Sequence, residues 1–172
     1  MVQGPNGSKN ASGGGGDYRA TLSSTGNFFA PGVITVSAPG GADIPALSAS
    51  ITVPAFPTMT SPPPDSANLT SVTRANGMTV TWSGGSPAGF IELDGFSYTD
   101  NTFTNGISFQ CSVPAGSGSF TIPPSVLLPL PAGNFGGLNF DPQVMPVSIP
   151  GTGLTVTQIT FKYDYFTPLS FK

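Results

Sequence analysis

The chain has 172 residues, of which only five Lys or Arg and eight Asp or Glu carry charge, giving 8 % charged residues and a formal net charge of −3. An ordinary soluble domain has about 25 % charged residues. The absence of histidine excludes a histidine-based catalytic triad, an imidazole general base and a His-ligated zinc or copper site. The single cysteine excludes an internal disulfide and a thiolate metal cluster, and five basic residues argue against nucleic acid as a partner.

The composition also predicts which part of the chain folds. Val, Ile, Leu and Phe make up about 24 % of the residues, above the roughly 20 % below which chains stay disordered. Residues 1–16 end in four glycines and predict a flexible leader, and residues 17–172 predict a single domain. No run approaches the about 20 apolar residues of a membrane span. The weakly charged, Ser- and Thr-rich composition predicts a secreted, extracellular protein.

From residue 17 onward, short runs rich in Val, Ile, Thr and Phe alternate with Gly, Pro, Asn and Ser, which is typical of strands and turns. The predicted strands are 17–23, 32–38, 45–53, 69–74, 77–83, 89–98, 106–113, 117–122, 135–140, 144–149 and 153–166. About ten short strands predict an all-β, antiparallel β-sandwich. Residues 57–66, with three consecutive prolines, predict a crossover between two sheets, and a boundary between two subdomains is the alternative.

The strand predicted over 77–83 carries the only tryptophan. Met78, Val80 and Trp82 share one face, and threonine and serine share the other. The apolar neighbours of Trp82 favour a core position, and a sugar-stacking role is the alternative.

The strand predicted over 89–98 has an unusual outer face. Ile91 and Leu93 form a core face, whereas two carboxylates alternate with two rings on the opposite one, at Phe90, Glu92, Asp94 and Phe96. Solvation does not explain acids placed between phenylalanines, so this face is predicted to bind a ligand or to be covered by another segment. Side chains two apart on a strand emerge roughly 6.5–7 Å apart, so a glycoside hydrolase-type carboxylate pair is the enzymatic alternative.

The segment that follows is rich in oxygen-bearing side chains. Asp94, Asp100, Asn101 and Asn105 are weak candidates for calcium, but their spacing does not match an EF-hand loop. Asp, Asn and Gly also form turns unaided, so a turn is the preferred interpretation, and neither a metal nor a cofactor is predicted.

The strand predicted over 106–113 carries the single cysteine. Cys111 shares a face with Ile107, Phe109 and Val113, so it is predicted to be a small buried apolar residue. It is not predicted to be a nucleophile, because no histidine is present to activate its thiol. In the last predicted strand, 153–166, Tyr163 and Tyr165 lie near the end, where their hydroxyls reach solvent.

Three segments resemble a known group of proteins: SAPGGADIPALSASITVP at 37–54, VTRANGMTVTWSGGSPAGFIELDGFS at 72–97 and FQCSVPAGSGSFTIPPSVLLPLP at 109–131. The chain resembles uncharacterised secreted proteins of soil bacteria, in which a C-terminal β-rich domain carries a Thr-Trp-Ser/Thr-Gly-Gly segment followed by a Cys and a Phe-Thr-Ile/Val-Pro stretch. The resemblance covers about residues 26–165. It implies export and an immunoglobulin-like β-sandwich, and it implies no activity and no site residues.

Two functions follow from these observations. The leading hypothesis is a non-enzymatic extracellular structural or interaction module, which meets other protein chains or itself through strand edges and can build a surface array or fibre. The alternative is a carbohydrate-binding module that binds polysaccharide through exposed aromatic rings. Its candidate ring residues are Tyr98, Phe103, Tyr163 and Tyr165, and Trp82 if it is exposed.

Overall fold

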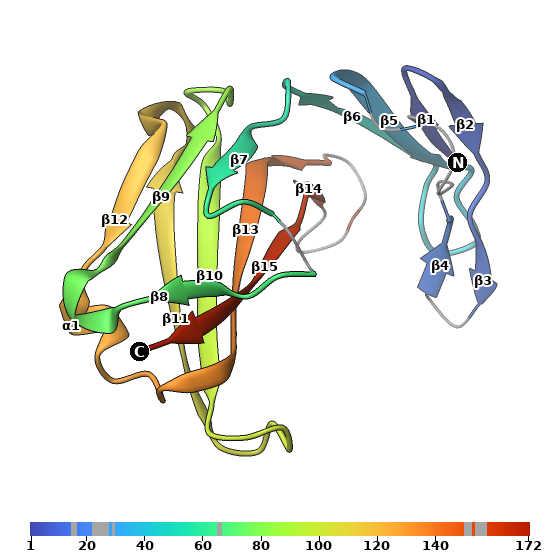
Figure 1. The fold of residues 1–172 in the computed structure, drawn as a ribbon. Coiled ribbons are helices and arrows are strands. Elements are labelled where there is room, and N and C mark those ends of the chain that lie inside the picture. Colours follow the sequence, from blue (N-terminus) through green and yellow to red (C-terminus); the bar gives the residue numbers. More distant parts are fainter. Residues whose placement is uncertain (15–16, 22–27, 29, 65–66, 150–152, 154–157) are drawn as a thin grey trace. The chain divides into compact units, whose positions relative to one another are not determined.

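The computed structural model describes the whole chain except residues 15–16, 22–27, 29, 65–66, 150–152 and 154–157 (Figure 1). The fold is all-β, with several sheets built mainly from antiparallel pairs, as the sequence predicts. The described helices are single turns: η1 (Arg74–Asn76), η2 (Ala115–Ser117) and α1 (Pro124–Leu127). None of the helices in this described part is long and apolar enough to cross a membrane.

The chain divides into two compact units, where the sequence predicted one domain. Unit 1 comprises Met1–Ala55 and Val144–Phe161, and unit 2 comprises Phe56–Gln143 and Lys162–Lys172. The first boundary, between Ala55 and Phe56, lies just before the proline-rich segment 57–66, where the alternative prediction placed a boundary between two subdomains. The second and third boundaries lie between predicted strands or inside one, and no break in composition marks them.

Unit 1 holds strands in the region predicted as a flexible leader. Its main sheet has the order β2-β1-β5-β6, and β3 pairs with β4. The strands are β1 (Val2–Gly4), β2 (Gly7–Lys9), β3 (Ser12–Gly14), β4 (Asp17–Arg19), β5 (Gly32–Ala38) and β6 (Leu47–Val53). Val2 lies opposite Val36 of β5, so tertiary pairing gives this glycine-rich segment an extended structure that its own composition does not favour. β14 (Gln158–Lys162) pairs with β13.

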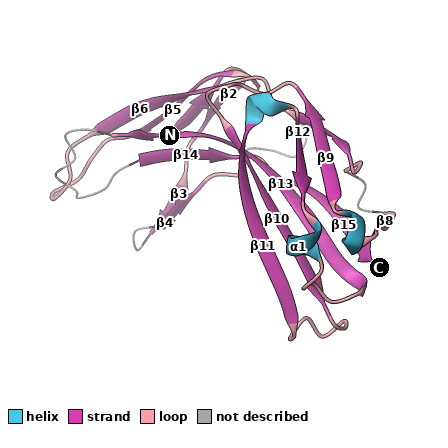
Figure 2. Cartoon of the chain, turned by 90° about the vertical axis from the view of Figure 1, so that its left-hand side faces the viewer, coloured by secondary structure: helices cyan, strands magenta, loops and turns pink. Residues whose placement is uncertain are grey.

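Unit 2 is sandwich-like, with a larger and a smaller sheet. The larger sheet has the order β11-β10-β13-β15-β8, and the smaller has the order β12-β9-β7 (Figure 2). The strands are β7 (Thr58–Ser61), β8 (Thr70–Val72), β9 (Met78–Ser83), β10 (Phe90–Tyr98), β11 (Gly106–Pro114), β12 (Ser119–Ile122), β13 (Gly133–Ser148) and β15 (Tyr165–Phe171). All neighbours are antiparallel except β15 and β8, which are parallel. The immunoglobulin-like topology stays a prediction.

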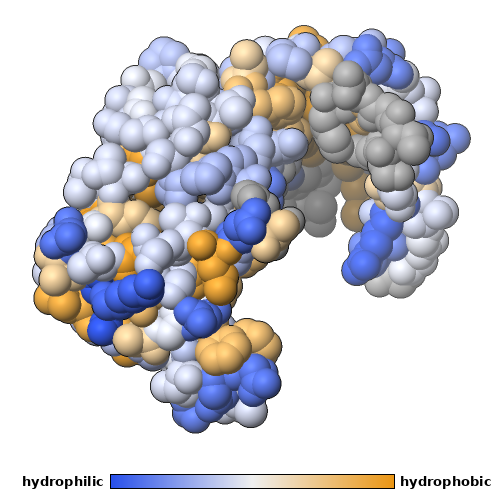
Figure 3. Space-filling view, in the orientation of Figure 1, coloured by the Kyte–Doolittle hydropathy of each residue, from blue (hydrophilic) through white to orange (hydrophobic). Residues whose placement is uncertain are grey.

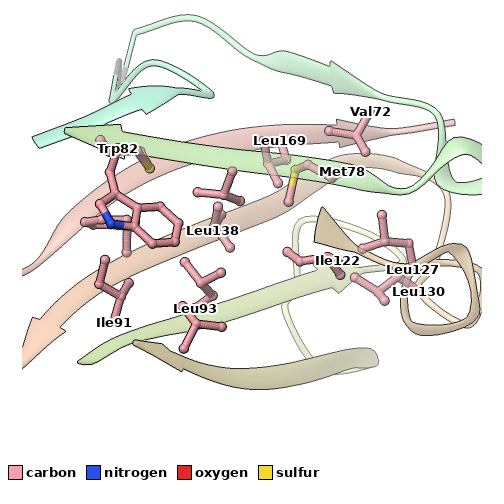
Figure 4. Packing of buried hydrophobic residues seen from close by; sticks show 14 of the residues in the cluster. Val72, Met78, Trp82, Ile91, Leu93, Ile122, Leu127, Leu130, Leu138 and Leu169 are labelled. Carbon is pink, nitrogen blue, oxygen red and sulfur yellow. The ribbon is translucent and has the colours of Figure 1, made fainter. Parts of the chain in front are cut away.

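The core of unit 2 lies between its two sheets (Figure 4). Met78, Val80 and Trp82 of β9 point inward, and Trp82 is 5 % exposed, so the prediction of a core tryptophan is confirmed. The indole Nε1–H of Trp82 donates a hydrogen bond to the carbonyl of Ala115 at 2.6 Å, which satisfies the polar end of the buried ring. Phe140 completes the contact, with its ring centroid 5.6 Å from that of Trp82.

The strand predicted over 153–166 is wrong in extent. β14 ends at Lys162 and β15 runs from Tyr165 to Phe171, so the core residues Leu169 and Phe171 were missed. Pro168 explains the error, because proline removes a backbone donor and argues against a central strand. The parallel ladder with β8 begins only at Leu169, so Pro168 lies where β15 has no partner on that side among the described strands.

Candidate functional site

The candidate site lies on the outer face of the larger sheet of unit 2, which is the face opposite the core. On β10, Ile91 and Leu93 are fully buried, so the alternating residues face outward. The outward residues are Phe90, Glu92, Asp94, Phe96 and Tyr98, as the alternation predicted. Phe90 begins the strand and Tyr98 ends it, so their Cα atoms are separated by roughly 26 Å of extended chain and belong to opposite ends of the face.

Five aromatic residues form a connected group at the Tyr98 end of this face, which we name the aromatic ladder: Phe96, Tyr98, Phe103, Phe135 and Phe166. The rings of Phe96 and Phe166 are nearly parallel, with an interplanar angle of 9° and centroids 6.3 Å apart. Tyr98 contacts Phe96 at 5.7 Å and Phe103 at 5.3 Å, and Phe103 contacts Phe135 at 6.4 Å. The ladder therefore joins β10, its hairpin loop, β13 and β15.

Three rings of the ladder are open to solvent. Phe103 is 58 % exposed, Phe166 41 % and Phe135 37 %, whereas Phe96 and Tyr98 are half-buried beneath them. The sequence predicted Phe96, Tyr98 and Phe103 but missed Phe135 and Phe166. Phe135 begins the strand predicted over 135–140, so listing the residues on both faces of that strand would have found it. Phe166 alternates with Tyr165, and the sequence predicted candidate rings only on the side of Tyr163 and Tyr165.

Two glycines of the sheet lie directly beneath these rings. Gly137 of β13 pairs with Phe96 of β10. A Cβ built on Gly137 would lie 2.5 Å from Cε2 of Phe166 and 2.7 Å from Cζ of Phe96. Gly106 lies opposite Tyr98, and a Cβ there would lie 2.5 Å from Cδ1 of that ring. Any larger residue would push the rings off the sheet, so the glycines allow the rings to lie against it.

The tip of the β10–β11 hairpin holds Phe103 in place. Phe103 has φ of 54°, a left-handed conformation that a bulky residue rarely adopts. The carboxylate of Asp100 accepts hydrogen bonds from the backbone N–H of Thr102 at 2.8 Å and from its hydroxyl at 2.5 Å. The N–H of Thr99 closes the loop on the carbonyl of Asn105 at 2.9 Å. In the space-filling view, hydrophobic surface lies at this tip among hydrophilic residues (Figure 3).

These contacts account for the residues considered as calcium ligands. Hydrogen bonds from Thr102 hold the pKa of the Asp100 carboxyl below its ordinary value of 3.8, because they stabilise the charged form. Asp100 therefore stabilises the turn, as the preferred interpretation stated, while Asp94 lies on β10 and Asn101 is an exposed loop residue. In the part of the chain that the structure describes, no group of three or more His, Cys, Asp or Glu could hold a metal ion.

A polar row lies beside the aromatic ladder on the same outer face. Asp94 lies between Gln110 of β11 and Asn139 of β13 in the sheet register. The side-chain amide of Gln143 donates a hydrogen bond to the carboxylate of Glu92. The row thus presents carboxylate and amide groups next to exposed rings; its members are Glu92, Asp94, Gln110, Asn139 and Gln143.

The two predicted carboxylates do not line a groove that the structure describes in unit 2. That groove has a volume of about 290 Å³ and is lined by Ser61, Pro62 and residues 70–73 and 76–79. Glu92 and Asp94 lie instead on the sheet face, both half-buried. Glycoside hydrolysis requires two carboxylates on opposite sides of the scissile bond, as in a cleft. Two carboxylates on one sheet face are better suited to binding a ligand.

Tyr163 and Tyr165 belong to a different group of rings. Tyr163 stacks on Phe56 at 5.0 Å and meets Tyr165 at 4.9 Å, and Tyr165 contacts the core residue Phe140 at 5.9 Å. Burial, and then the neighbouring Tyr163, raise the pKa of the Tyr165 hydroxyl. These contacts lead into the core, so the structure separates the two tyrosines from the aromatic ladder.

Cys111 is half-buried on the core side of β11, packed against the core. Burial raises the pKa of its thiol, and the negative charge of Asp94 raises it further. Both effects disfavour the thiolate, which is the nucleophilic form. This agrees with the prediction that Cys111 is a packing residue.

Comparisons of the chain with known protein families, with curated proteins and with solved structures found no match. The resemblance to secreted proteins of soil bacteria therefore stays a prediction.

Proposed function

We propose that this chain is a non-enzymatic, extracellular binding module, and that the outer face of the larger sheet in unit 2 binds an uncharged polysaccharide. The observation that carries the proposal is the aromatic ladder, with three solvent-exposed rings, beside a row of carboxylate and amide groups. This develops the carbohydrate-binding alternative from the sequence, which expects exposed, coplanar rings on a sheet face or at a loop tip. Of the rings that it named, Tyr98 and Phe103 belong to the ladder, and Phe103 meets the exposed Phe135 at 87° rather than coplanar with it.

The chemistry of a sugar matches both halves of the face. A pyranose ring presents a flat surface of C–H groups, which packs on an aromatic ring, and a rim of hydroxyls, which donate and accept hydrogen bonds. Phe166 and Phe96 offer parallel rings, and two acceptors lie beside them: Asp94 two residues before Phe96 on β10, and Asn139 of β13 directly opposite Phe166. A patch of rings without polar neighbours would suit an apolar protein surface better.

The negative charge of the polar row favours an uncharged polysaccharide over an anionic one. Glu92 and Asp94 are the acidic members of the polar row, and its other members are neutral amides. An anionic polymer would be repelled by these carboxylates, whereas the hydroxyls of a neutral polymer can donate to the carboxylates and can both donate to and accept from the amides. Cellulose, chitin, mannan and starch are therefore suitable probes.

The proposal is tested by depletion of the full chain from solution by these four insoluble polysaccharides. We expect at least one of them to bind the protein, and we expect Phe166→Ala to weaken that binding about three- to tenfold, the value of one aromatic contact. Tyr18→Ala is the matched control, because Tyr18 is 67 % exposed and lies in unit 1. Absence of binding to all four probes, or equal binding by Phe166→Ala, would overturn the proposal.

A further inference from the structure

A second feature of unit 2 is the free edge of its larger sheet. β11 is the last strand on one side, and among the described strands it pairs only with β10 (Figure 2). The pairing runs without a break from Phe90 opposite Pro114 to Tyr98 opposite Gly106. The far side of this nine-residue strand therefore presents a row of backbone N–H and C=O groups of the kind that another strand can pair with.

The usual protections of a sheet edge are missing from β11. Proteins commonly block an edge with charged side chains, with an internal proline or with a bulge. Positions 106–114 contain no charged residue, the only proline is the last residue, Pro114, and the register with β10 has no shift.

The core-facing side chains of β11 are also incompletely covered. Ile107 is 45 % exposed, and Phe109 and Cys111 are half-buried although all three alternate on the core side with the buried Val113. The smaller sheet has only three strands, which leaves this margin of the core open. A strand added at this edge would bring a second row of side chains next to these apolar residues.

We infer that two copies of the chain associate through β11, paired antiparallel about a two-fold axis at Gln110, so that their larger sheets form one continuous sheet. This register overlaps all nine residues of the strand. It places Ile107 opposite Val113 and Phe109 opposite Cys111 of the second copy, and Ser108 opposite Ser112. Apolar residues therefore meet on the core side and polar residues meet on the outer side.

The alternation of apolar and polar residues along β11 favours a second copy of this strand as the partner. A slip of one residue in the pairing would turn the apolar side chains of the incoming strand to the outer face. Only registers that place apolar residues opposite apolar residues therefore bury them on the core side. β11 satisfies this condition with itself, because apolar and polar residues alternate symmetrically about Gln110. In a two-fold pair the β11 edge of each copy is fully paired with the β11 edge of the other. No β11 edge is then left for a third copy, so the association stops at a dimer.

Analytical ultracentrifugation of the full chain over a wide range of concentrations tests the association. We expect a monomer–dimer equilibrium, and we expect Gln110→Lys to raise the dimer dissociation constant about fivefold, because two like charges then face each other. Gln110 is exposed on the outer face, so the fold tolerates the change. Ala132→Lys, which adds the same charge on an exposed loop, is the matched control.

Charge reversal provides an independent check. Gln110→Glu alone should weaken the dimer as Gln110→Lys does, and a mixture of the two variants should dimerise at least as strongly as the original chain. A wild-type chain that sediments as a monomer at every concentration overturns the inference, as does a Gln110→Lys variant that dimerises normally. These outcomes do not depend on polysaccharide binding.

The register is tested by oxidation of mixed cysteine variants in a Cys111→Ser background. Ser108→Cys mixed with Ser112→Cys should form a disulfide between copies, because directly opposite Cα atoms lie within about 5.5 Å. Ser108→Cys alone should not, since its two copies lie roughly 13 Å apart along the strands. Cross-linking of Ser108→Cys alone, or none in the mixture, overturns the proposed register.

Discussion

Gly136 and Gly137 are neighbours on β13, yet they face opposite sides of the larger sheet. A Cβ on Gly136 would lie 2.6 Å from Cε2 of Phe171, a ring in the core, and a Cβ on Gly137 would lie 2.5 Å from Cε2 of Phe166, a ring on the outer face. Phe171 is 1 % exposed and Phe166 is 41 % exposed. The same local contact, a ring lying over a glycine, therefore occurs once in the core and once on a face where the ring stays partly exposed to water.

This difference in burial distinguishes a ring that stabilises the fold from a ring that is available to a ligand. Burying the ring of Phe171 contributes to the free energy of folding, which explains its position without any ligand. The ring of Phe166 gains much less from folding, because much of its surface stays in water. A ring held over a glycine at a cost in exposed apolar surface is better explained by a ligand that covers it.

The largest expected effect concerns the two rings. Phe171→Ala should lower the free energy of unfolding by about 3–5 kcal/mol, the usual cost of removing a buried phenylalanine. Phe166→Ala should lower it by less, about 1 kcal/mol, because Phe166 is only partly buried. Urea denaturation of the two variants measures both values. Equal losses would contradict the distinction between the two faces.

The two glycines should differ in the same sense. Gly136→Ala forces a methyl group against the fixed ring of Phe171 and should cost about 1–3 kcal/mol, as overpacking does. Gly137→Ala should cost less, since the ring of Phe166 can move into solvent. The same denaturation experiment compares them, and a larger loss for Gly137→Ala would show that the outer rings are as constrained as the core.

Phe103 allows a test in which stability and binding move apart. Phe103→Asn removes a ladder ring at a position with φ of 54°, where asparagine is tolerated far better than phenylalanine. Unfolding free energy should stay constant or rise by up to about 1 kcal/mol, while polysaccharide binding falls about threefold. A variant that loses stability and keeps binding would refute the role assigned to this ring.

The smallest effect is a pH dependence at the hairpin tip. The folded pKa of Asp100 lies below 3.8, so its contribution to the turn is complete above that value and is lost as the pH falls through the folded pKa. The amide of Thr102 should therefore shift in NMR spectra only below about pH 4. Asp100→Asn should abolish this titration, and an unchanged titration would assign it to another group.

The sequence predicted the local parts of this site and missed the distant ones. Alternation on β10 placed Phe96 and Asp94 on one face, and the apolar neighbours of Trp82 placed it in the core, because both are properties of single strands. The contact of Phe96 with Phe166 depends on strand order, since β13 lies between their strands. No periodicity in one strand encodes that order.

Two further misses occur where the local composition argues against a strand. The glycines of residues 1–16 predicted a flexible leader, but β1 is held by its pairing with β5, a long-range contact that composition does not reveal. Pro168 concealed β15, although it lies just before the ladder with β8 begins. In both places tertiary pairing outweighs the intrinsic preference of the residues.

Binding isotherms of Gly136→Ala and Gly137→Ala on the polysaccharide that binds the unaltered chain test the central claim most directly. The two variants add the same methyl group at adjacent positions, so they differ only in the face that they disturb. Gly137→Ala should bind about three- to tenfold more weakly than the unaltered chain, and folded Gly136→Ala should bind normally. Equal binding by both variants, or weaker binding by Gly136→Ala, would contradict the account.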